Sequence, residues 1–443
     1  MEFGWPLANN VIVIIYTTRY RKGGAQFPLV AKTLAKEKAD DGFEGEIISR
    51  AVESKREVLQ IFEETKSAGQ QVMEFHFVGH SGMYGPMFGT VAFPEQFSPY
   101  EWETMNIPFA ENATAHFHCC RSARWFAPFF SRTFDVKTFG FFWYTTFSRR
   151  KTKFVYAGSD VTMEKLYTIG CKGRKSHGLV ASFLKFARLM PAENMKSFDP
   201  QPAMGDTTYD HVAALYDKAF EDIRVRKDEW EWVNNHLCQN GHQSVLDIGC
   251  GNGALLNALS SRIMCGAGVD ESEAILERAR KRNAGISNIE FSKIDSPILP
   301  FDDATFDVTI SLMSFRYLDW DPLLKEIKRV MKPGGRLLIV DMVTDPVKLR
   351  EYPQLVVDKF RTLARQRTNA TFNANLQRLV SHPDWKRMLE YNPIRSEHEM
   401  KWYLESRFPG QKMETLNLGW HARIVAFDSG PVEGGVELNL SYP

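Results

Sequence analysis

The sequence has little of several features that would place a protein in a special class. Its six cysteines are too few for a disulfide framework in 443 residues, which favours reduced thiols and a cytoplasmic location. Lysine and arginine (55) nearly balance aspartate and glutamate (54), so the net charge of +1 indicates no nucleic-acid partner. The first residues lack the pattern of a secretory leader. No apolar run approaches the ~20 residues of a membrane-spanning helix, and we expect no membrane partner.

The bulk composition describes an ordinary globular protein with more than one domain. Hydrophobic residues make up 44% of the chain and charged residues 25%, which allows sizeable cores. The length predicts about two or three domains. Proline and polar residues gather at 191–205 without helical or strand periodicity, which predicts a linker at 196–208. We therefore expect one domain over 1–195, a second over 209–430, and a loose tail over 431–443.

One segment in the second half combines a strand, a glycine turn and a helix. Residues 244–253 read Ser-Val-Leu-Asp-Ile-Gly-Cys-Gly-Asn-Gly, and the apolar residues before the glycines predict a buried strand. Gly249, Gly251 and Gly253 let the backbone turn tightly and approach a ligand, because no Cβ stands in the way. A strand, a glycine turn and a helix open a nucleotide-binding α/β fold. The spacing differs from the Gly-x-Gly-x-x-Gly dinucleotide fingerprint.

The segments downstream continue this pattern. A strand ends at Asp270, 23 residues after Asp247, where a carboxylate can accept hydrogen bonds from both hydroxyls of a ribose. A third strand ends at Asp295, and a fourth covers 308–312. The turn Met-Lys-Pro-Gly-Gly at 331–335 then leads into a fifth strand.

Together these segments resemble class I S-adenosylmethionine-dependent methyltransferases, in particular the group that includes ubiquinone and menaquinone biosynthesis enzymes. The resemblance covers residues 206–428. It implies an α/β, Rossmann-like seven-stranded domain, S-adenosylmethionine as cofactor, a small-molecule acceptor, and a helical insertion over the substrate pocket at 341–393. It places the cofactor on Asp247, Gly249, Gly251, Gly253, Asp270, Asp295, Ser296 and Ser311.

The sequence marks the cofactor site more clearly than it marks a catalytic group. Methyl transfer from a sulfonium is an in-line displacement, in which the enzyme mainly holds the nucleophile in line with the methyl group. A general base is needed only where the nucleophile must lose a proton, and histidine has a suitable pKa for that role. The catalytic residue stays unknown, with His421, Tyr317 and Asp341 as candidates. Further candidates for the substrate pocket, which could equally serve packing or surface polarity, are Tyr209, Tyr216, Phe315 and Arg316.

The first half predicts a different α/β domain. Strands are expected at 11–16, 71–78 and 113–120, and helical periodicity covers 27–38 and 46–67. Strands that alternate with helices predict a parallel sheet, whose carboxyl edge gathers ligand-binding and catalytic groups.

Two of these strands end at reactive side chains. His80 follows one strand and Cys120 ends another, and an imidazole that takes the proton of a thiol makes it a nucleophile. This order resembles the caspase-like cysteine peptidase superfamily, which implies an α/β sandwich with His80 as base and Cys120 as nucleophile. The caspase surround Gln-Ala-Cys-x-Gly is absent, so we expect a domain without peptidase activity, structural or substrate-completing. The alternative is a cysteine peptidase or self-processing protein with a regulatory cofactor-binding domain.

A zinc site is an alternative interpretation of the same strands. His116, His118 and Cys120 would share one face of an extended strand, with His76 and His80 nearby, and imidazoles together with a thiolate can bind zinc. These residues lack the paired Cys-x-x-Cys spacing of structural zinc sites. We therefore expect no metal.

Overall fold

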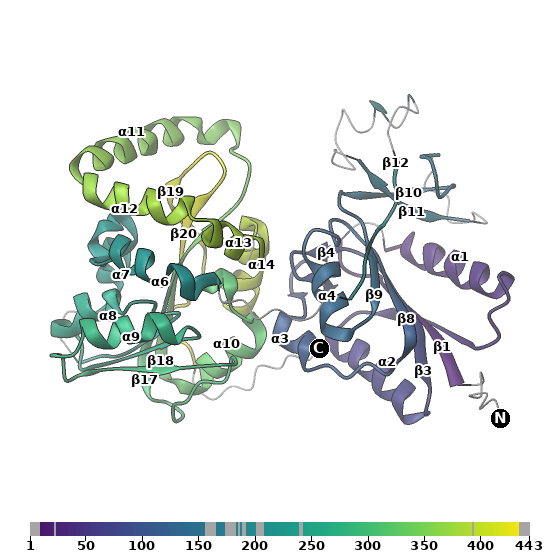
Figure 1. The fold of residues 1–443 in the computed structure, drawn as a ribbon, viewed down its shortest axis with the longest axis horizontal. Helices are drawn as coiled ribbons and strands as arrows, with labels where there is room; N and C mark the ends of the chain where they lie inside the picture. The colour runs from purple at the N-terminus through teal and green to yellow at the C-terminus, as the bar shows by residue number, and fades with distance from the viewer. Residues whose placement is uncertain are drawn as a thin grey trace. The chain divides into compact units, whose positions relative to one another are not determined.

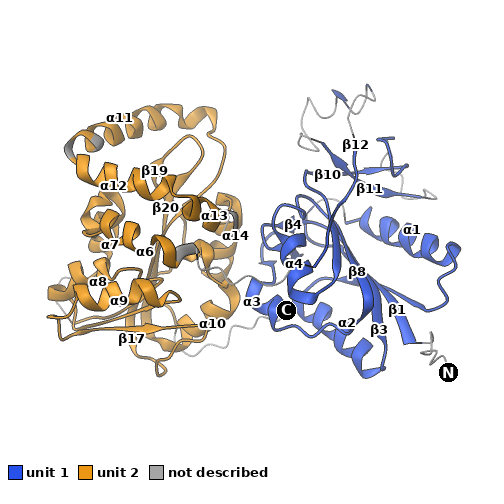
Figure 2. Ribbon diagram, in the orientation of Figure 1, with its two compact units in different colours: residues 1–204 blue, residues 205–443 orange. Residues whose placement is uncertain are grey.

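The computed structural model describes residues 9–21, 24–155, 165–172, 183–184, 187, 192–200, 208–238, 242–391 and 394–433. The chain divides into two compact units, residues Met1–Met204 and Gly205–Pro443, which Figure 2 shows in different colours. Each unit has its own sheets and its own hydrophobic cores. Within the described ranges, no helix combines the length and the apolar character needed to cross a membrane.

The first unit is built on a sheet whose described strands lie in the order β13-β9-β8-β3-β1-β2 (Figure 1). They pair in parallel, except that β13 is antiparallel to β9. The strands are β1 (Asn10–Thr17), β2 (Glu46–Val52), β3 (Gln71–Val78), β8 (Phe109–His118), β9 (Lys137–Gly140) and β13 (Lys196–Phe198). A smaller antiparallel sheet joins β10 (Thr145–Ser148), β11 (Tyr167–Cys171) and β12 (Ala192–Glu193). Two short hairpins pair β4 (Ser81–Gly82) with β5 (Gly85–Pro86) and β6 (Phe88–Gly89) with β7 (Pro94–Glu95).

Helices cover both faces of this sheet because β1 is apolar on both sides. Val13 and Ile15 pack with α2 (Lys55–Ser67), α3 (Pro99–Glu103) and α4 (Phe126–Phe134) in one core. The alternate residues Ile12 and Ile14 pack on α1 (Phe27–Asp40) in another. A strand buried on both faces is typical of a parallel sheet with helices on each side.

The second unit holds a sheet whose strands, among the residues described, lie in the order β16-β15-β14-β17-β18-β20-β19. Figure 1 labels four of them, β17, β18, β19 and β20. β20 is antiparallel to both of its neighbours, and the other described pairs are parallel. The predicted Rossmann-like arrangement is thus confirmed. The strands are β14 (Ser244–Ile248), β15 (Cys265–Asp270), β16 (Ile289–Lys293), β17 (Phe306–Leu312), β18 (Met331–Val343), β19 (Glu414–Leu418) and β20 (Arg423–Asp428).

Helices lie on both faces of this sheet as well. Leu246 of β14 faces a core shared with α10 and α14, whereas its neighbour Val245 faces a core shared with α7 and α8. The segment predicted as an insertion, 341–393, begins in the end of β18 and contains α11, α12 and α13. The helices are α6 (Thr208–Ala219), α7 (Lys227–His236), α8 (Ala254–Leu259), α9 (Glu273–Arg282), α10 (Trp320–Val330), α11 (Tyr352–Thr368), α12 (Ala370–Ser381), α13 (Pro383–Tyr391) and α14 (Glu397–Arg407).

Three boundaries differ from those expected. Residues 46–52, predicted as helix, form strand β2 because their register beside β1 outweighs the helix-forming residues that they contain. The first residues of the predicted linker form β13, which pairs with β9. The predicted loose tail is packed at its start, since Val432 is 8% exposed and its backbone bonds to Gly334 and Gly335. Residues 434–443 of that tail lie outside the described ranges.

Candidate functional site

The candidate site lies at the carboxyl edge of the sheet in the second unit. At β14 the strand order changes direction, since β15 and β16 lie on one side and β17 and β18 on the other. Ligands of open parallel sheets bind at such a point, because connections that leave in opposite directions open a crevice there. The glycine turn after β14 and Asp270 at the end of β15 both stand at this edge.

The backbone angles and close contacts of the turn at 249–253 require glycine. Gly249 has a φ of +69°, and a Cβ there would lie 2.4 Å from the Cβ of Ser314. Gly251 has a φ of +54°, and a Cβ there would come 3.3 Å from the ring of Tyr216 in α6. Glycine alone meets these demands without strain. The backbone of the turn therefore lies directly against Tyr216.

Asp270 is oriented by backbone groups on either side of it. Its Oδ2 accepts a hydrogen bond from the N–H of Gly251 at 2.9 Å, and its Oδ1 accepts one from the N–H of Ser272 at 3.0 Å. Burial raises the pKa of Asp270, and these backbone donors oppose that rise. The carboxylate is thus held in one orientation at the strand end, where a ribose contact is predicted.

Asp247 is the second acid of the site and lies inside β14. It is 2% exposed, and its Oδ1 accepts no hydrogen bond from the residues that the structure describes. Burial, together with the negative charge of Asp270, raises the pKa of Asp247 to about 8. A buried carboxyl oxygen without a partner is unfavourable. A positive charge beside the two acids would stabilise them, so the site suits a cationic ligand.

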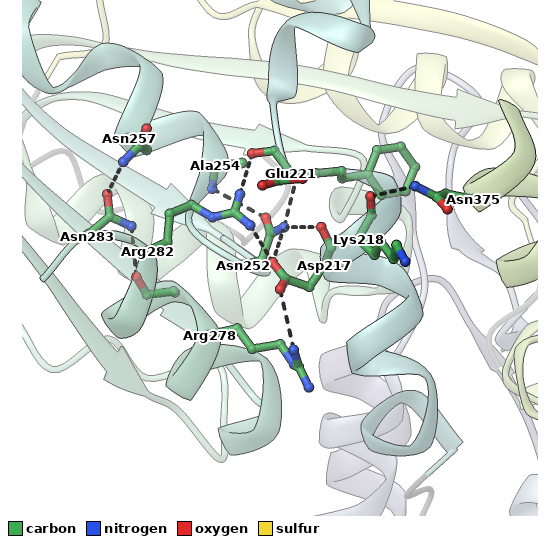
Figure 3. A network of polar contacts seen from close by, with 12 residues as sticks. Asp217, Lys218, Glu221, Asn252, Ala254, Asn257, Arg278, Arg282, Asn283 and Asn375 are labelled. Atoms are coloured by element: carbon green, nitrogen blue, oxygen red, sulfur yellow. Dashed lines mark hydrogen bonds and ion pairs between the residues drawn. The ribbon is translucent and has the colours of Figure 1, made fainter. Parts of the chain in front are cut away.

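A polar network fastens α6 to the glycine turn (Figure 3). The Nδ2 of Asn252 donates to Oδ1 of Asp217 at 3.0 Å and to the carbonyl oxygen of Phe220 at 2.9 Å. The same Asp217 accepts from Arg282 of α9, and Arg278 lies 3.4 Å from it. The network joins three segments that are distant in the sequence.

Sequence reasoning missed this network. Asp217 and Arg282 are 65 residues apart, and no local pattern pairs them. The available signal was Asn252, a polar residue inside the glycine turn that proves 3% exposed. The hydroxyl of Ser272 also donates to Asp210 of α6. Helix α6 is therefore bonded to the glycine turn, to α9 and to the residues that follow β15.

A buried ion pair lies where β17 and β18 end. The guanidinium of Arg316 pairs with Asp341, and its Nη2 donates to the Oη of Tyr317 at 2.7 Å. The backbone N–H of Arg316 donates to Oδ2 of Asp341 at 2.6 Å. Burial acts to lower the pKa of Arg316, but Asp341 and Tyr317 together outweigh burial and raise it. Asp341, 0% exposed, thus positions Arg316. The catalytic roles proposed from the sequence for Asp341 and Tyr317 remain predictions.

Three predicted cofactor residues lie in varied surroundings at the same edge. The Asp295 side chain is 80% exposed and pairs with Lys293. Ser296 follows it after β16. Ser311 is fully buried, and its hydroxyl lies 2.7 Å from the hydroxyl of Ser314. The cofactor contacts of Asp295, Ser296 and Ser311 stay predictions.

The other pocket candidates are placed as follows. Phe315 is 0% exposed and stacks on Trp320 in a hydrophobic core, with the ring centroids 5.4 Å apart. Of the two roles left open for Phe315, the structure thus shows packing, because its ring turns inward after β17. His421 is exposed in the turn between β19 and β20, and its role as a base remains a prediction. The side chain of Tyr209 lies outside the described residues.

In the first unit, His80 and Cys120 follow the neighbouring parallel strands β3 and β8. The Sγ of Cys120 lies 3.2 Å from Oγ1 of Thr145 and accepts a hydrogen bond from the N–H of Thr145 at 3.3 Å. The His80 ring meets Phe27 and Tyr20 edge to face, with centroid distances of 5.3 and 5.7 Å. The thiol thus has two contacts with Thr145, and the dyad stays a prediction.

A cluster of possible metal ligands spans β3 and β8. Donor atoms of Glu74, His76 and His116 all lie within 4.8 Å of one another. The two ring nitrogens of His76 lie 2.9 Å from Glu74 and 3.1 Å from His118, and Lys38 pairs with Glu74 at 2.6 Å. Burial lowers the pKa of His76, His116 and His118, which favours their neutral forms. The hydrogen bonds account for this arrangement without an ion, and the expectation of no metal remains untested.

Comparison with known proteins matches residues 245–335 to the family described as Methyltransferase domain. A demethylmenaquinone methyltransferase of Clavibacter sepedonicus is 34% identical over 152 residues, which cover 34% of this chain and 62% of that protein. Sterol 4-C-methyltransferase strm-1 of Caenorhabditis elegans is 32% identical over 131 residues, 29% of this chain and 37% of that protein. The chain thus spans less than two thirds of these relatives. A solved S-adenosylmethionine-dependent methyltransferase from Aquifex aeolicus has 21% identity and a TM-score of 0.32, covering 46% of this chain and 92% of that one.

The residues matched to the family, 245–335, carry the glycine turn and both acids. The second unit therefore contains a methyltransferase domain. The domain is of the S-adenosylmethionine-dependent class.

Proposed function

We propose that the second unit transfers a methyl group from S-adenosylmethionine to a small hydrophobic acceptor. One observation carries the proposal. Asp247 and Asp270 are close enough for the charge of one to raise the pKa of the other, and Oδ1 of Asp247 lacks a hydrogen-bond partner among the described residues. S-adenosylmethionine carries a sulfonium and an ammonium group, which complement this pair of acids.

The residues at the carboxyl edge of the sheet would have different roles in binding the cofactor and the acceptor. The oriented carboxylate of Asp270 would accept the ribose hydroxyls, and the glycine turn would let the backbone approach the cofactor. When bound, the cofactor supplies an electrophilic methyl group on positively charged sulfur. Tyr216 lies against the turn and would limit the access of water there. Arg316, held by Asp341, donates to the hydroxyl of Tyr317, which would face the acceptor.

An apolar cluster formed by α6 together with helices of the insertion supports an apolar acceptor. Helices α6, α12 and α13 share an apolar cluster, and Asn375 of α12 donates to the backbone oxygen of Lys218 at 3.3 Å. The named relatives act on demethylmenaquinone and on a sterol. We infer a quinone- or sterol-like acceptor that lies under the insertion. The members of the cluster are Val212, Leu215, Tyr216, Ala219, Phe220, Val225, Phe372, Leu376, Leu379 and Trp385.

The test is a transfer assay on the full chain with methyl-labelled S-adenosylmethionine. The acceptors are a demethylated quinone, a sterol and, as a polar control, phosphoethanolamine. Label should enter the quinone or the sterol and not phosphoethanolamine. Cofactor binding without transfer to either apolar acceptor, or equal transfer to phosphoethanolamine, would contradict the proposed acceptor class.

For the first unit we propose a caspase-like domain without peptidase activity and with a structural role. The strand order with an antiparallel strand beside β9 supports the fold, as does the position of His80 and Cys120 after neighbouring strands. The contacts between Cys120 and Thr145 support a thiol that does not act as a nucleophile. Cys119 is a poor nucleophile as well, since burial raises its pKa to about 12.

The reactivity of Cys120 tests this proposal. Because its sulfur is engaged by Thr145, iodoacetamide should label Cys120 no faster than the exposed Cys238, and His80→Ala should not change the rate. Mass spectrometry of peptides from the full chain measures both rates. Fast labelling of Cys120 that disappears in His80→Ala would instead support the cysteine peptidase alternative.

A further inference from the structure

Helix α11 carries an apolar stripe on its outward face. Tyr352, Val356, Phe360 and Leu363 recur at the three- and four-residue spacing that places side chains on one face of a helix. These side chains are 43%, 51%, 69% and 48% exposed. A contiguous apolar surface of this kind is uncommon on a monomeric protein and marks an interaction surface.

The stripe cannot turn inward, because the opposite face of α11 is fixed to the second unit. Leu355 is 2% exposed, and Asp358, 1% exposed, accepts a hydrogen bond from the N–H of Leu418 at 3.0 Å. Arg365 donates two hydrogen bonds to Asp228 of α7, at 2.6 and 2.7 Å. These contacts on the inner face leave the stripe facing outward.

Two further apolar residues extend the stripe. Leu349, just before α11, is 89% exposed. Trp420, in the turn between β19 and β20, is 50% exposed, and its ring lies edge to face with Tyr352 at 6.2 Å. The ammonium of Lys359 lies 5.4 Å from the Trp420 ring. Tryptophan and tyrosine beside lysine are the residues that settle at a membrane–water interface.

The charged residues of α11 are nearly all basic. The helix contains Lys359, Arg361, Arg365 and Arg367 and a single acid, Asp358, which is buried. At about 100° per residue, Lys359 and Arg367 lie on the side of the stripe, whereas Arg361 and Arg365 lie toward the inner face and pair with Asp358 and Asp228. Lys359 and Arg367 therefore place positive charge beside the stripe, which complements an anionic layer.

We propose that α11 docks on the surface of a membrane that carries anionic phospholipids. The stripe and Trp420 enter the interfacial region, and the flanking cations meet the phosphate groups. A second copy of this chain fits the stripe less well, because a two-fold contact would bring the same cations face to face.

This docking goes beyond methyl transfer and does not depend on it. It needs no spanning segment, whereas the expectation of no membrane partner rested on the lack of a long apolar run. Helix α11 belongs to the insertion that follows β18 at the carboxyl edge of the sheet. Docking through α11 would bring that edge to the layer in which an apolar acceptor dissolves.

Sedimentation with lipid vesicles tests the proposal on the full chain. The chain should bind vesicles made of two parts phosphatidylcholine to one part phosphatidylglycerol more tightly than vesicles of phosphatidylcholine alone. The double variant Val356→Glu, Phe360→Glu should bind the anionic vesicles about 100-fold more weakly, because it removes two apolar side chains from the contact. High salt should weaken binding by the wild type without abolishing it.

Met264→Glu is the matched control, since Met264 is a 52% exposed apolar residue outside α11. It should bind vesicles like the wild type, and both variants should keep the wild-type affinity for S-adenosylhomocysteine and the wild-type melting temperature. No binding to anionic vesicles, or an equal loss in Met264→Glu, would overturn the proposal. So would a dimer, seen by light scattering, that the α11 variant separates while its vesicle binding stays unchanged.

Discussion

Replacing Asp270 with alanine is expected to weaken the binding of S-adenosylmethionine by about 100-fold or more. The carboxylate is held by Gly251 and Ser272, and we propose that it accepts two ribose hydroxyls. Hydrogen bonds to a charged group contribute roughly 1.5–3 kcal/mol each, and both would be lost. Isothermal titration calorimetry of the full chain measures the change.

A carboxylate elsewhere in the same unit provides the control. Asp302→Asn removes an exposed acid before β17 and should leave the affinity unchanged. Gly249→Arg should abolish binding as Asp270→Ala does, because a side chain at Gly249 meets Ser314. If Asp270→Ala and Gly249→Arg both kept the wild-type affinity while remaining folded, the cofactor site would lie elsewhere.

The ligand-free protein should lose a contribution to its stability as the pH rises from about 4 to about 8. In the unfolded chain the Asp247 carboxyl titrates near its ordinary value of 3.8, and in the folded protein its pKa is raised to about 8. Between these values the folded state holds a proton that the unfolded state releases. The free energy of unfolding therefore falls by about 1.4 kcal/mol per pH unit from this group alone.

Asp247→Asn isolates this contribution. The amide cannot titrate. The stability of the variant relative to the wild type should therefore increase steadily between about pH 4 and pH 8, and the difference should stay constant above pH 8. Denaturant unfolding followed across this range measures the difference, with Asp302→Asn as the control. A difference between Asp247→Asn and wild type that does not change with pH would show that Asp247 is already ionised in the folded protein.

The parts of the site that could be predicted from the sequence are those made by neighbours in the chain. The strand and glycine turn at 244–253 follow from a local run of apolar residues and glycines, and the structure places both there. Asp270 was identified because a strand leads directly to it. In each case the residue types fix the backbone within a few residues, so no distant contact needs to be known.

The parts that could not be predicted depend on distant contacts. Asp217 gains its role only when folding brings it to Asn252 and Arg282. Residues 46–52 contain helix formers, and only pairing with β1 makes them a strand. An aromatic residue such as Phe315 could line a pocket or pack in a core, and only its contact with Trp320 shows that it lies in the core.

The central claim is that a cationic cofactor binds beside the buried acids Asp247 and Asp270. The most direct measurement is the number of protons released when S-adenosylmethionine binds near pH 7, obtained by calorimetry in buffers of different ionisation enthalpy. Below about pH 8 the ligand-free Asp247 holds its proton, and a positive charge beside it favours the carboxylate. The account predicts release of up to about one proton, declining above pH 8 and absent in Asp247→Asn. Binding without proton release at pH 7, or equal release in Asp247→Asn, would contradict it.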